Sequence, residues 1–101
     1  EEKVIASLPE KFELKQNYPN PFNPSTNIAF SIPEDADITI KVFNTLGQEA
    51  ATLADNYFSA GEHIIQFNAV NLAGGIYIYT LNGVGSSGKR FSASGKAMLL
   101  K

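Results

Sequence analysis

Short stretches of alternating apolar and polar residues are the feature that most constrains how this chain can fold. Every second residue from Ile28 to Ile32 is large and apolar, and the residues between them are polar or small. Because the side chains of a strand point alternately to opposite faces, this pattern predicts a half-buried strand. The alternation returns in residues 38–42, and no long stretch repeats apolar residues at helical spacing. The chain is therefore predicted to be all-β.

Turn-forming residues separate the predicted strands. Pro33 ends the first strand, and residues 44–47 predict a tight hairpin in which Gly47 takes the positive φ that such a loop requires. Residues 59–61 mark another turn, and the glycine- and serine-rich residues 82–88 predict a flexible hairpin loop. The predicted strands are residues 27–32, 38–42, 48–53, 62–68, 76–81 and a final strand over 89–100 that a bulge near Gly95 interrupts.

Two of the predicted strands carry apolar residues on both faces. This pattern predicts that residues 62–68 form a central strand and that residues 76–81 form a strand covered on both sides. Turns that recur every 8 to 12 residues or so over about 100 residues are typical of two packed sheets. The sequence therefore predicts an immunoglobulin-like antiparallel β-sandwich of about seven strands.

Length and composition fit a single domain. Of 101 residues, 44% are hydrophobic and 18% are charged, so the chain can bury enough apolar surface to offset the entropy lost on folding. Residues 1–15 show weak periodicity and mixed charge, and we interpret them as a linker or lead-in segment before a domain over 16–101. Because the chain starts at Glu1 rather than at a methionine, we expect it to be a module of a longer polypeptide.

Cysteine content and charge exclude several classes of function. With no cysteine and one histidine, the chain cannot build a disulfide framework, a thiolate metal site or a multi-histidine centre. The net charge is −2 and no basic-aromatic patch is present, which argues against nucleic-acid binding. All ten acidic residues and four of the eight basic residues lie in the first 62 positions, giving −6 there and +4 in the remainder. The basic end either faces an acidic partner or discourages strand aggregation.

A proline-rich stretch, residues 17–26, is the most specific local motif, and we call it the proline segment. Its three prolines alternate with asparagines around two aromatic residues, which predicts a stiff, extended lead into the first core strand. Tyr18 and Phe22 are expected to close one end of the sandwich. An alternative is a calcium site built from asparagine oxygens, which bind the ion weakly without acidic neighbours. The bracing residues are Asn20, Pro21, Phe22, Asn23 and Pro24, and the calcium alternative uses Asn17, Asn20 and Asn23.

No residues match a catalytic motif. His63 is the only histidine and lies within a strand pattern, so we interpret it as a half-buried strand residue. Glu34, Asp35 and Asp37 lie together near a turn, where water would reach a catalytic acid, and they are expected to form the turn. The sequence therefore predicts no enzyme, no cofactor and no metal site.

Four aromatic residues leave a carbohydrate platform open as an alternative. Flat aromatic faces on a β-sandwich can stack on sugar rings, but placement at every second position favours packing inside the protein. The residues concerned are Tyr57, Phe58, Tyr77 and Tyr79.

Several motifs follow one another along the chain: residues 18–24 with Thr26, 43–47, 60–63, and 72–77 with Tyr79 and Leu81. Together they resemble a known family, the type A C-terminal sorting domain of type IX (Por) secretion. The resemblance runs from about Leu14 to Lys101, and it implies a domain that directs an upstream cargo in the same chain through export.

The resemblance also implies partners, a destination and a recognition element. The partners would be the outer-membrane translocon and sortase-like surface-attachment machinery of a Gram-negative bacterium. The cargo would pass through the periplasm to the cell surface or the medium. Members of the family end in a basic, methionine-containing, apolar run, which here corresponds to Lys96, Met98, Leu99, Leu100 and Lys101. Gly47, Gly61 and Gly75 would hold turns, and Tyr77 would belong to the core strand that follows.

Two other functions stay open at this point. One is an accessory carbohydrate-binding domain of a secreted hydrolase. The other is a purely structural module, because the proline segment and the Gly-Ile-Tyr strand also resemble the immunoglobulin-like part of flagellar hook-capping scaffold proteins.

Overall fold

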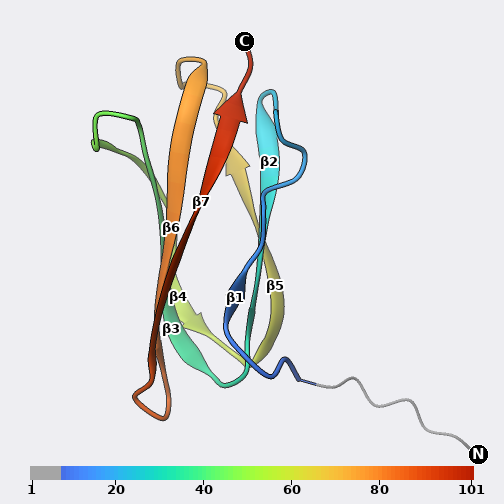
Figure 1. Ribbon diagram of the computed structural model, residues 1–101, viewed down its shortest axis with the longest axis vertical. Coiled ribbons are helices and arrows are strands. Elements are labelled where there is room, and N and C mark those ends of the chain that lie inside the picture. Colours follow the sequence, from blue (N-terminus) through green and yellow to red (C-terminus); the bar gives the residue numbers. More distant parts are fainter. Residues whose placement is uncertain (1–7) are drawn as a thin grey trace, which may run out of the picture.

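The computed structural model describes residues 8–101 as two antiparallel sheets packed face to face (Figure 1). One sheet has the strand order β1-β2-β5, and the other has the order β4-β3-β6-β7. The seven strands are β1 (Glu13–Leu14), β2 (Ser25–Ile32), β3 (Ala36–Phe43), β4 (Glu49–Phe58), β5 (Gly61–Asn68), β6 (Gly75–Gly85) and β7 (Arg90–Leu99). The predicted all-β, immunoglobulin-like sandwich is thus confirmed. No helix that could cross a membrane occurs in the part of the chain that the structure describes.

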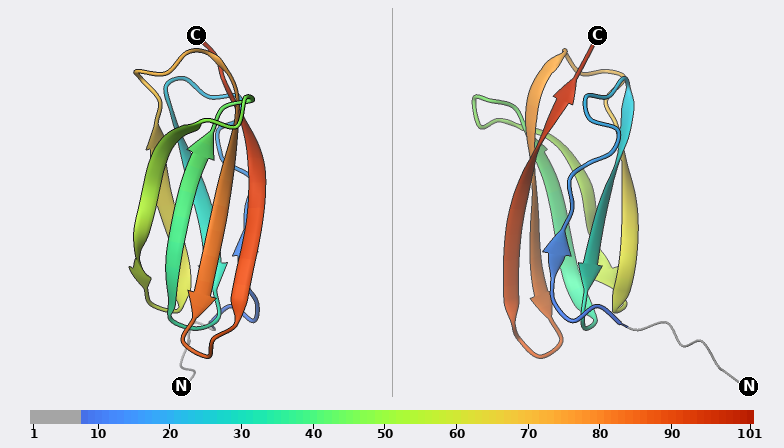
Figure 2. Two further views of the ribbon diagram at one scale, coloured as in Figure 1. Left: turned by 90° about the vertical axis from the view of Figure 1, so that its left-hand side faces the viewer. Right: turned by 45° about the vertical axis from the view of Figure 1, so that its right-hand side comes forward.

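The core lies between the two sheets and consists of the inward side chains of alternating positions. Along β2 these are Ile28, Phe30 and Ile32, as the period of two predicts. The facing sheet supplies Ile38, Ile40, Val42, Tyr77, Tyr79, Leu81, Ala97 and Leu99. The residues that alternate with them on β6 and β7 point to the outer face of the four-stranded sheet, which Figure 2 shows in its left view.

Two glycines have a different role from the predicted one. The predicted loop over residues 82–88 is shorter, because β6 continues to Gly85, and β7 pairs with β6 in unbroken register, so no bulge interrupts it at Gly95. A Cβ added at Gly83 would lie 2.9 Å from the Ile38 side chain, and one added at Gly95 would lie 2.3 Å from the Tyr79 ring. These glycines therefore provide space for side chains of neighbouring strands.

The predicted position of residues 62–68 is wrong. They form β5, which is an edge strand beside β2, and Ile64 is 68% exposed. Residues 76–81 do occupy an inner strand, with β3 and β7 on either side of β6. Their outer face is only partly covered, however, since Ile76 and Ile78 are half-buried.

The lead-in segment contributes to the sandwich where the structure describes it. Residues 1–7 lie outside the described part, but β1 pairs with β2, with Leu14 opposite Phe30. Phe12 is buried, and its ring stacks on Phe91 of β7 at a centroid distance of 5.0 Å. The chain thus enters the fold between the edges of the two sheets, beside β7 (Figure 2, right).

Candidate functional site

The proline segment is packed against the end of the core through one aromatic ring. Phe22 is buried, and its ring lies 5.6 Å from that of Phe67. Asn17 is also buried, and its Nδ2 donates hydrogen bonds to Thr26 Oγ1 (3.0 Å) and to the carbonyl of Pro19 (3.2 Å). Tyr18 was expected to help close this end but is 79% exposed, so that prediction is wrong. The Asn17 amide thus satisfies the carbonyl of Pro19 in a segment in which proline cannot donate.

The same segment holds the end of the last strand. The backbone N–H of Phe22 donates to the carbonyl of Met98 (2.9 Å), and the carbonyl of Phe22 accepts from the N–H of Leu100 (2.9 Å). The side chain of Asn20 accepts a bond from the N–H of Met98 (2.9 Å), and that of Gln16 donates to the carbonyl of Lys96 (2.9 Å). We call these four bonds the β7 clamp. They occupy the backbone groups that the C-terminal half of this edge strand would otherwise present.

The buried Tyr79 of β6 bonds to the backbone of the two residues that flank Gln16. The hydroxyl of Tyr79 accepts a bond from the N–H of Asn17 (2.9 Å) and donates to the carbonyl of Lys15 (3.1 Å). Burial raises the pKa of Tyr79, and the bond from Asn17 acts in the opposite direction. Gly95 leaves space for the ring on β7. Tyr79 therefore fixes where the chain enters the fold.

The predicted recognition residues alternate between the surface and the core. Leu99 is buried and packs in the same cluster as Phe22, whereas Lys96, Met98 and Leu100 are exposed. Lys101 is also exposed, and its Nζ donates to the carbonyl of Val70 (2.8 Å). Of the five predicted residues, four can therefore be reached from solvent, and Leu99 anchors the strand that carries them.

The other predicted structural residues lie at turns or on inner strands. Gly47, Gly61 and Gly75 have φ values of 83°, 137° and 145°, which residues with a side chain rarely adopt. Tyr77 is buried, and its hydroxyl donates to the carbonyl of Ala73 (2.6 Å). Pro21, Asn23 and Pro24 are exposed, and the carbonyl of Pro24 accepts a bond from the N–H of Ala69 (2.8 Å).

The acidic turn residues act as local hydrogen-bond acceptors. Asp35 accepts from the N–H of Ala60 and from the hydroxyl of Tyr57, both at 2.8 Å, and these bonds lower its pKa. Glu34 accepts from Ser86 and Ser87, and the bonds from Ser87 lower its pKa most. Asp37 lies in β3 rather than in the turn.

His63 is a half-buried strand residue, as predicted. Its ring packs against Phe30 and Phe58 at 5.3 and 5.0 Å, and its Nε2 lies 2.8 Å from the carbonyl of Ser59. Within residues 8–101, no three His, Cys, Asp or Glu side chains are close enough together to hold a metal ion.

The aromatic residues considered for carbohydrate binding do not share a surface. Tyr77 and Tyr79 are buried in the core, and Phe58 packs edge-on against Phe30. Only Tyr57 is exposed, and its hydroxyl is bonded to Asp35. The structure thus contradicts an aromatic platform made of these four residues.

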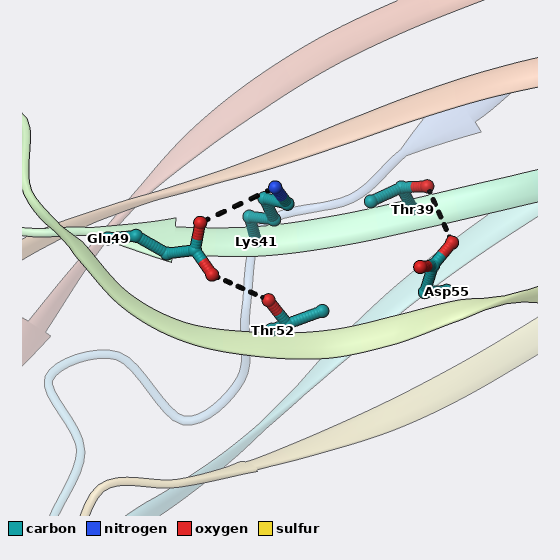
Figure 3. Close-up of polar contacts among 5 residues, drawn as sticks. All are labelled: Thr39, Lys41, Glu49, Thr52 and Asp55. Atoms are coloured by element: carbon teal, nitrogen blue, oxygen red, sulfur yellow. Dashed lines mark hydrogen bonds and ion pairs between the residues drawn. The ribbon is translucent and has the colours of Figure 1, made fainter.

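The middle of the outer face of β3 and β4 is polar, and Lys41, Glu49 and Asp55 have partners there (Figure 3). Lys41 Nζ lies 3.4 Å from Glu49 Oε1, and the other oxygen of Glu49 accepts a bond from Thr52 (2.7 Å). The Thr52 bond, followed by Lys41, lowers the pKa of Glu49. Thr39 donates to Asp55 at 3.2 Å. This half of the sheet therefore has the solvated surface expected of an antiparallel sheet with one face in water.

The fold and the β7 clamp define the class of immunoglobulin-like β-sandwich domains, here with the last strand tied to the proline segment. The chain belongs to the family described as the secretion system C-terminal sorting domain, whose model matches residues 16–91. No curated protein matches the chain. The domain is a C-terminal sorting signal for type IX secretion, recognised by the secretion machinery and attached to an upstream cargo that it directs to the cell surface or medium. The family is not catalytic.

Proposed function

We propose that the secretion machinery recognises this domain through the outward side chains at the end of β7, those of Lys96, Met98 and Leu100, together with Lys101. The β7 clamp is the observation that supports this proposal. Because the clamp occupies the backbone groups of Lys96, Met98 and Leu100 along the free edge, a partner must contact the side chains there. The family model matches residues 16–91, so the proposed role of residues 96–101 is supported by their geometry and by the resemblance of the sequence.

The partners in this proposal are the outer-membrane translocon, followed by sortase-like machinery that attaches the cargo at the surface of a Gram-negative bacterium. The cargo reaches them through the periplasm. The domain itself is not an enzyme, since its histidine and its turn acids are engaged in local packing and hydrogen bonds. The acid-free end of the chain fits an acidic receptor surface.

The test is a reporter protein fused to residues 1–101 and expressed in a bacterium that has type IX secretion. Deleting residues 96–101 should abolish export, but it also removes the β7 clamp. The double variant Met98→Ser, Leu100→Ser is the sharper test, because these side chains are 38% and 51% exposed. Val84→Ser is a matched control on the outer face of β6, where Val84 is 37% exposed.

We expect the double variant to remain folded and to be retained in the cell, while the control is exported. Export of the folded double variant at the wild-type level would overturn the proposed role of these side chains.

A further inference from the structure

The outer face of the four-stranded sheet changes character along its length. Over its middle, the side chains paired across β3, β6 and β7 are polar or charged, as expected of a sheet face in water. Near the end of the sheet that carries the C-terminus, which is at the top of Figure 2 (left), most of the paired side chains are apolar. The polar rows are Thr39–Asn82–Ser92 and Lys41–Thr80–Ser94, and the rows that follow are Phe43–Ile78–Lys96 and Ile76–Met98.

The apolar rows border an open groove of about 620 Å³. Its floor contains Phe43, Ile76 and Ile78, its wall is the hairpin over residues 44–47, and Lys96 lies at its border. We call this set the outer groove. The hairpin projects from the body of the sandwich on the side of the four-stranded sheet (Figure 1).

The wall of the outer groove is held in place by one side chain. Asn44 Oδ1 accepts bonds from the N–H groups of Leu46 (2.9 Å) and Gln48 (3.0 Å), and Asn44 Nδ2 donates to Gln48 Oε1 (2.8 Å). Leu46, at the tip of the hairpin, is 82% exposed. The groove is therefore formed before anything binds, which reduces the entropic cost of docking.

The core does not account for the apolar residues of the groove. The inward residues of the same strands, Val42, Tyr77 and Tyr79, already pack between the sheets. Ile76 and Ile78 point away from them and stay half-buried, next to the exposed Met98. Apolar residues that gather on one part of a sheet face, beside polar rows, are typical of a site of interaction.

Charge restricts what can cover the groove. Lys96 is the only charged residue in its lining, and no ion pair joins it to another residue in the 8–101 range. Glu49 of β4 lies opposite Phe43 and so next to the groove, but it already pairs with Lys41 (Figure 3). A second copy packed groove to groove would bury two Lys96 side chains in one contact, with no carboxylate in either groove lining to pair them, which is unfavourable. The occupant is therefore apolar and carries a carboxylate.

We propose that the outer groove docks an apolar protein segment bearing a carboxylate, which belongs to the secretion machinery. The apolar part of the segment covers Ile76, Ile78 and Phe43, and its carboxylate pairs with Lys96. This proposal rests on the proposed function and extends the recognised surface from the end of β7 to β3 and β6. The signal is then a folded surface made from three strands.

The reporter fusion in a type IX-competent bacterium tests this proposal. The variant Ile76→Thr, Ile78→Thr removes the apolar floor and keeps residues that favour strands. Ile64→Thr is the matched control, because Ile64 is exposed on β5 of the other sheet. Lys96→Glu reverses the charge at the groove, and Lys89→Glu is its control at the opposite end of β7. Thermal melts of each purified domain establish that it is folded.

We expect the double threonine variant and Lys96→Glu each to lower export about tenfold, as expected for loss of central anchors in an interface. Both controls should be exported normally. Normal export of the folded double threonine variant would overturn the groove as the docking surface. If Met98→Ser, Leu100→Ser still blocks export in that case, the proposed function survives without the groove.

Two further outcomes would also count against the proposal. Normal export of Lys96→Glu would overturn the carboxylate as the partner's recognised group. A wild-type domain that dimerises in size-exclusion chromatography, and becomes monomeric in the double threonine variant, would show that a second copy covers the groove. If the double threonine variant does not fold, Thr45→Arg decides the outcome, because Thr45 is an exposed residue of the groove lining that is not among the proposed β7 recognition residues; normal export of this variant would overturn the groove as the docking surface.

Discussion

Replacing Tyr79 with phenylalanine removes one oxygen atom from the core and should weaken the link between the chain's point of entry and β6. The hydroxyl accepts a bond from the N–H of Asn17 and donates to the carbonyl of Lys15, and Tyr79 is only 1% exposed. Without the oxygen, a buried N–H loses its acceptor, which costs about 1–3 kcal/mol of the free energy of unfolding. For a domain of this size, each kcal/mol lowers the Tm by about 4–8 °C.

The assay is thermal unfolding followed by circular dichroism, with Tyr57→Phe as the control. That substitution removes the same atom from a tyrosine that is 63% exposed and bonded to Asp35, where water can replace the lost bond. The Tm of Tyr79→Phe should fall by about 10 °C, and that of Tyr57→Phe by clearly less. Equal shifts in the two variants would refute the argument that burial makes the Tyr79 bonds stabilising.

Two other predictions concern a close contact and a titrating acid. Gly95→Ala places a methyl group 2.3 Å from the Tyr79 ring, so overpacking should lower the free energy of unfolding by about 1–3 kcal/mol, measured by urea denaturation; an unchanged urea midpoint would contradict this. The bonds from Ala60 and Tyr57 lower the pKa of Asp35, so its stabilising contribution is complete above about pH 4 and is lost as the pH falls through the lowered pKa. The variant Asp35→Asn should therefore lose less stability than the wild type between about pH 5 and pH 2, measured as urea midpoints. If its stability falls as steeply as that of the wild type, another acid is responsible.

Period-two alternation was sufficient to predict the core-facing residues of β2 and β3, although β4 and β6 run beyond their predicted ends. Ile28, Phe30 and Ile32 are inward because nothing else in β2 can fill the space between two sheets. The order of strands within a sheet is a different matter. Apolar residues on both faces of β5 indicated a central strand, but β5 is an edge strand and Ile64 is exposed. Single apolar residues are common on protein surfaces, and the side chains of a strand do not indicate whether a neighbouring strand is present.

Glycine was the least reliable guide, because the same residue can form a turn or make room for a neighbour. Gly47 forms the predicted turn with positive φ, whereas Gly83 and Gly95 lie in regular strands beside large side chains from other strands. The neighbours concerned, Ile38 and Tyr79, are distant in sequence, so the sequence alone could not distinguish the two roles.

The candidate site combines residues that no local pattern connects. The resemblance directed attention to the end of the chain, and four of the five residues that it indicated are exposed. The bond between Asn20 and Met98 spans 78 residues, and Phe43 and Ile78 meet only because β3 pairs with β6. The apolar Ile76 and Ile78 are a signal of this surface in the sequence, because an outer face does not require apolar residues there. The same pattern, however, is expected of a strand that is buried on both faces.

The β7 clamp also has a consequence for how a cell distinguishes complete chains from truncated ones. Phe22 is made early and finds its backbone partners, Met98 and Leu100, only after nearly the whole domain has left the ribosome. A chain that stops before Met98 lacks those partners and leaves the proline segment unpaired. If export depends on the clamped strand, as proposed, it requires that the domain be translated to its last strand and folded, so that a chain ending before Met98 would stay behind.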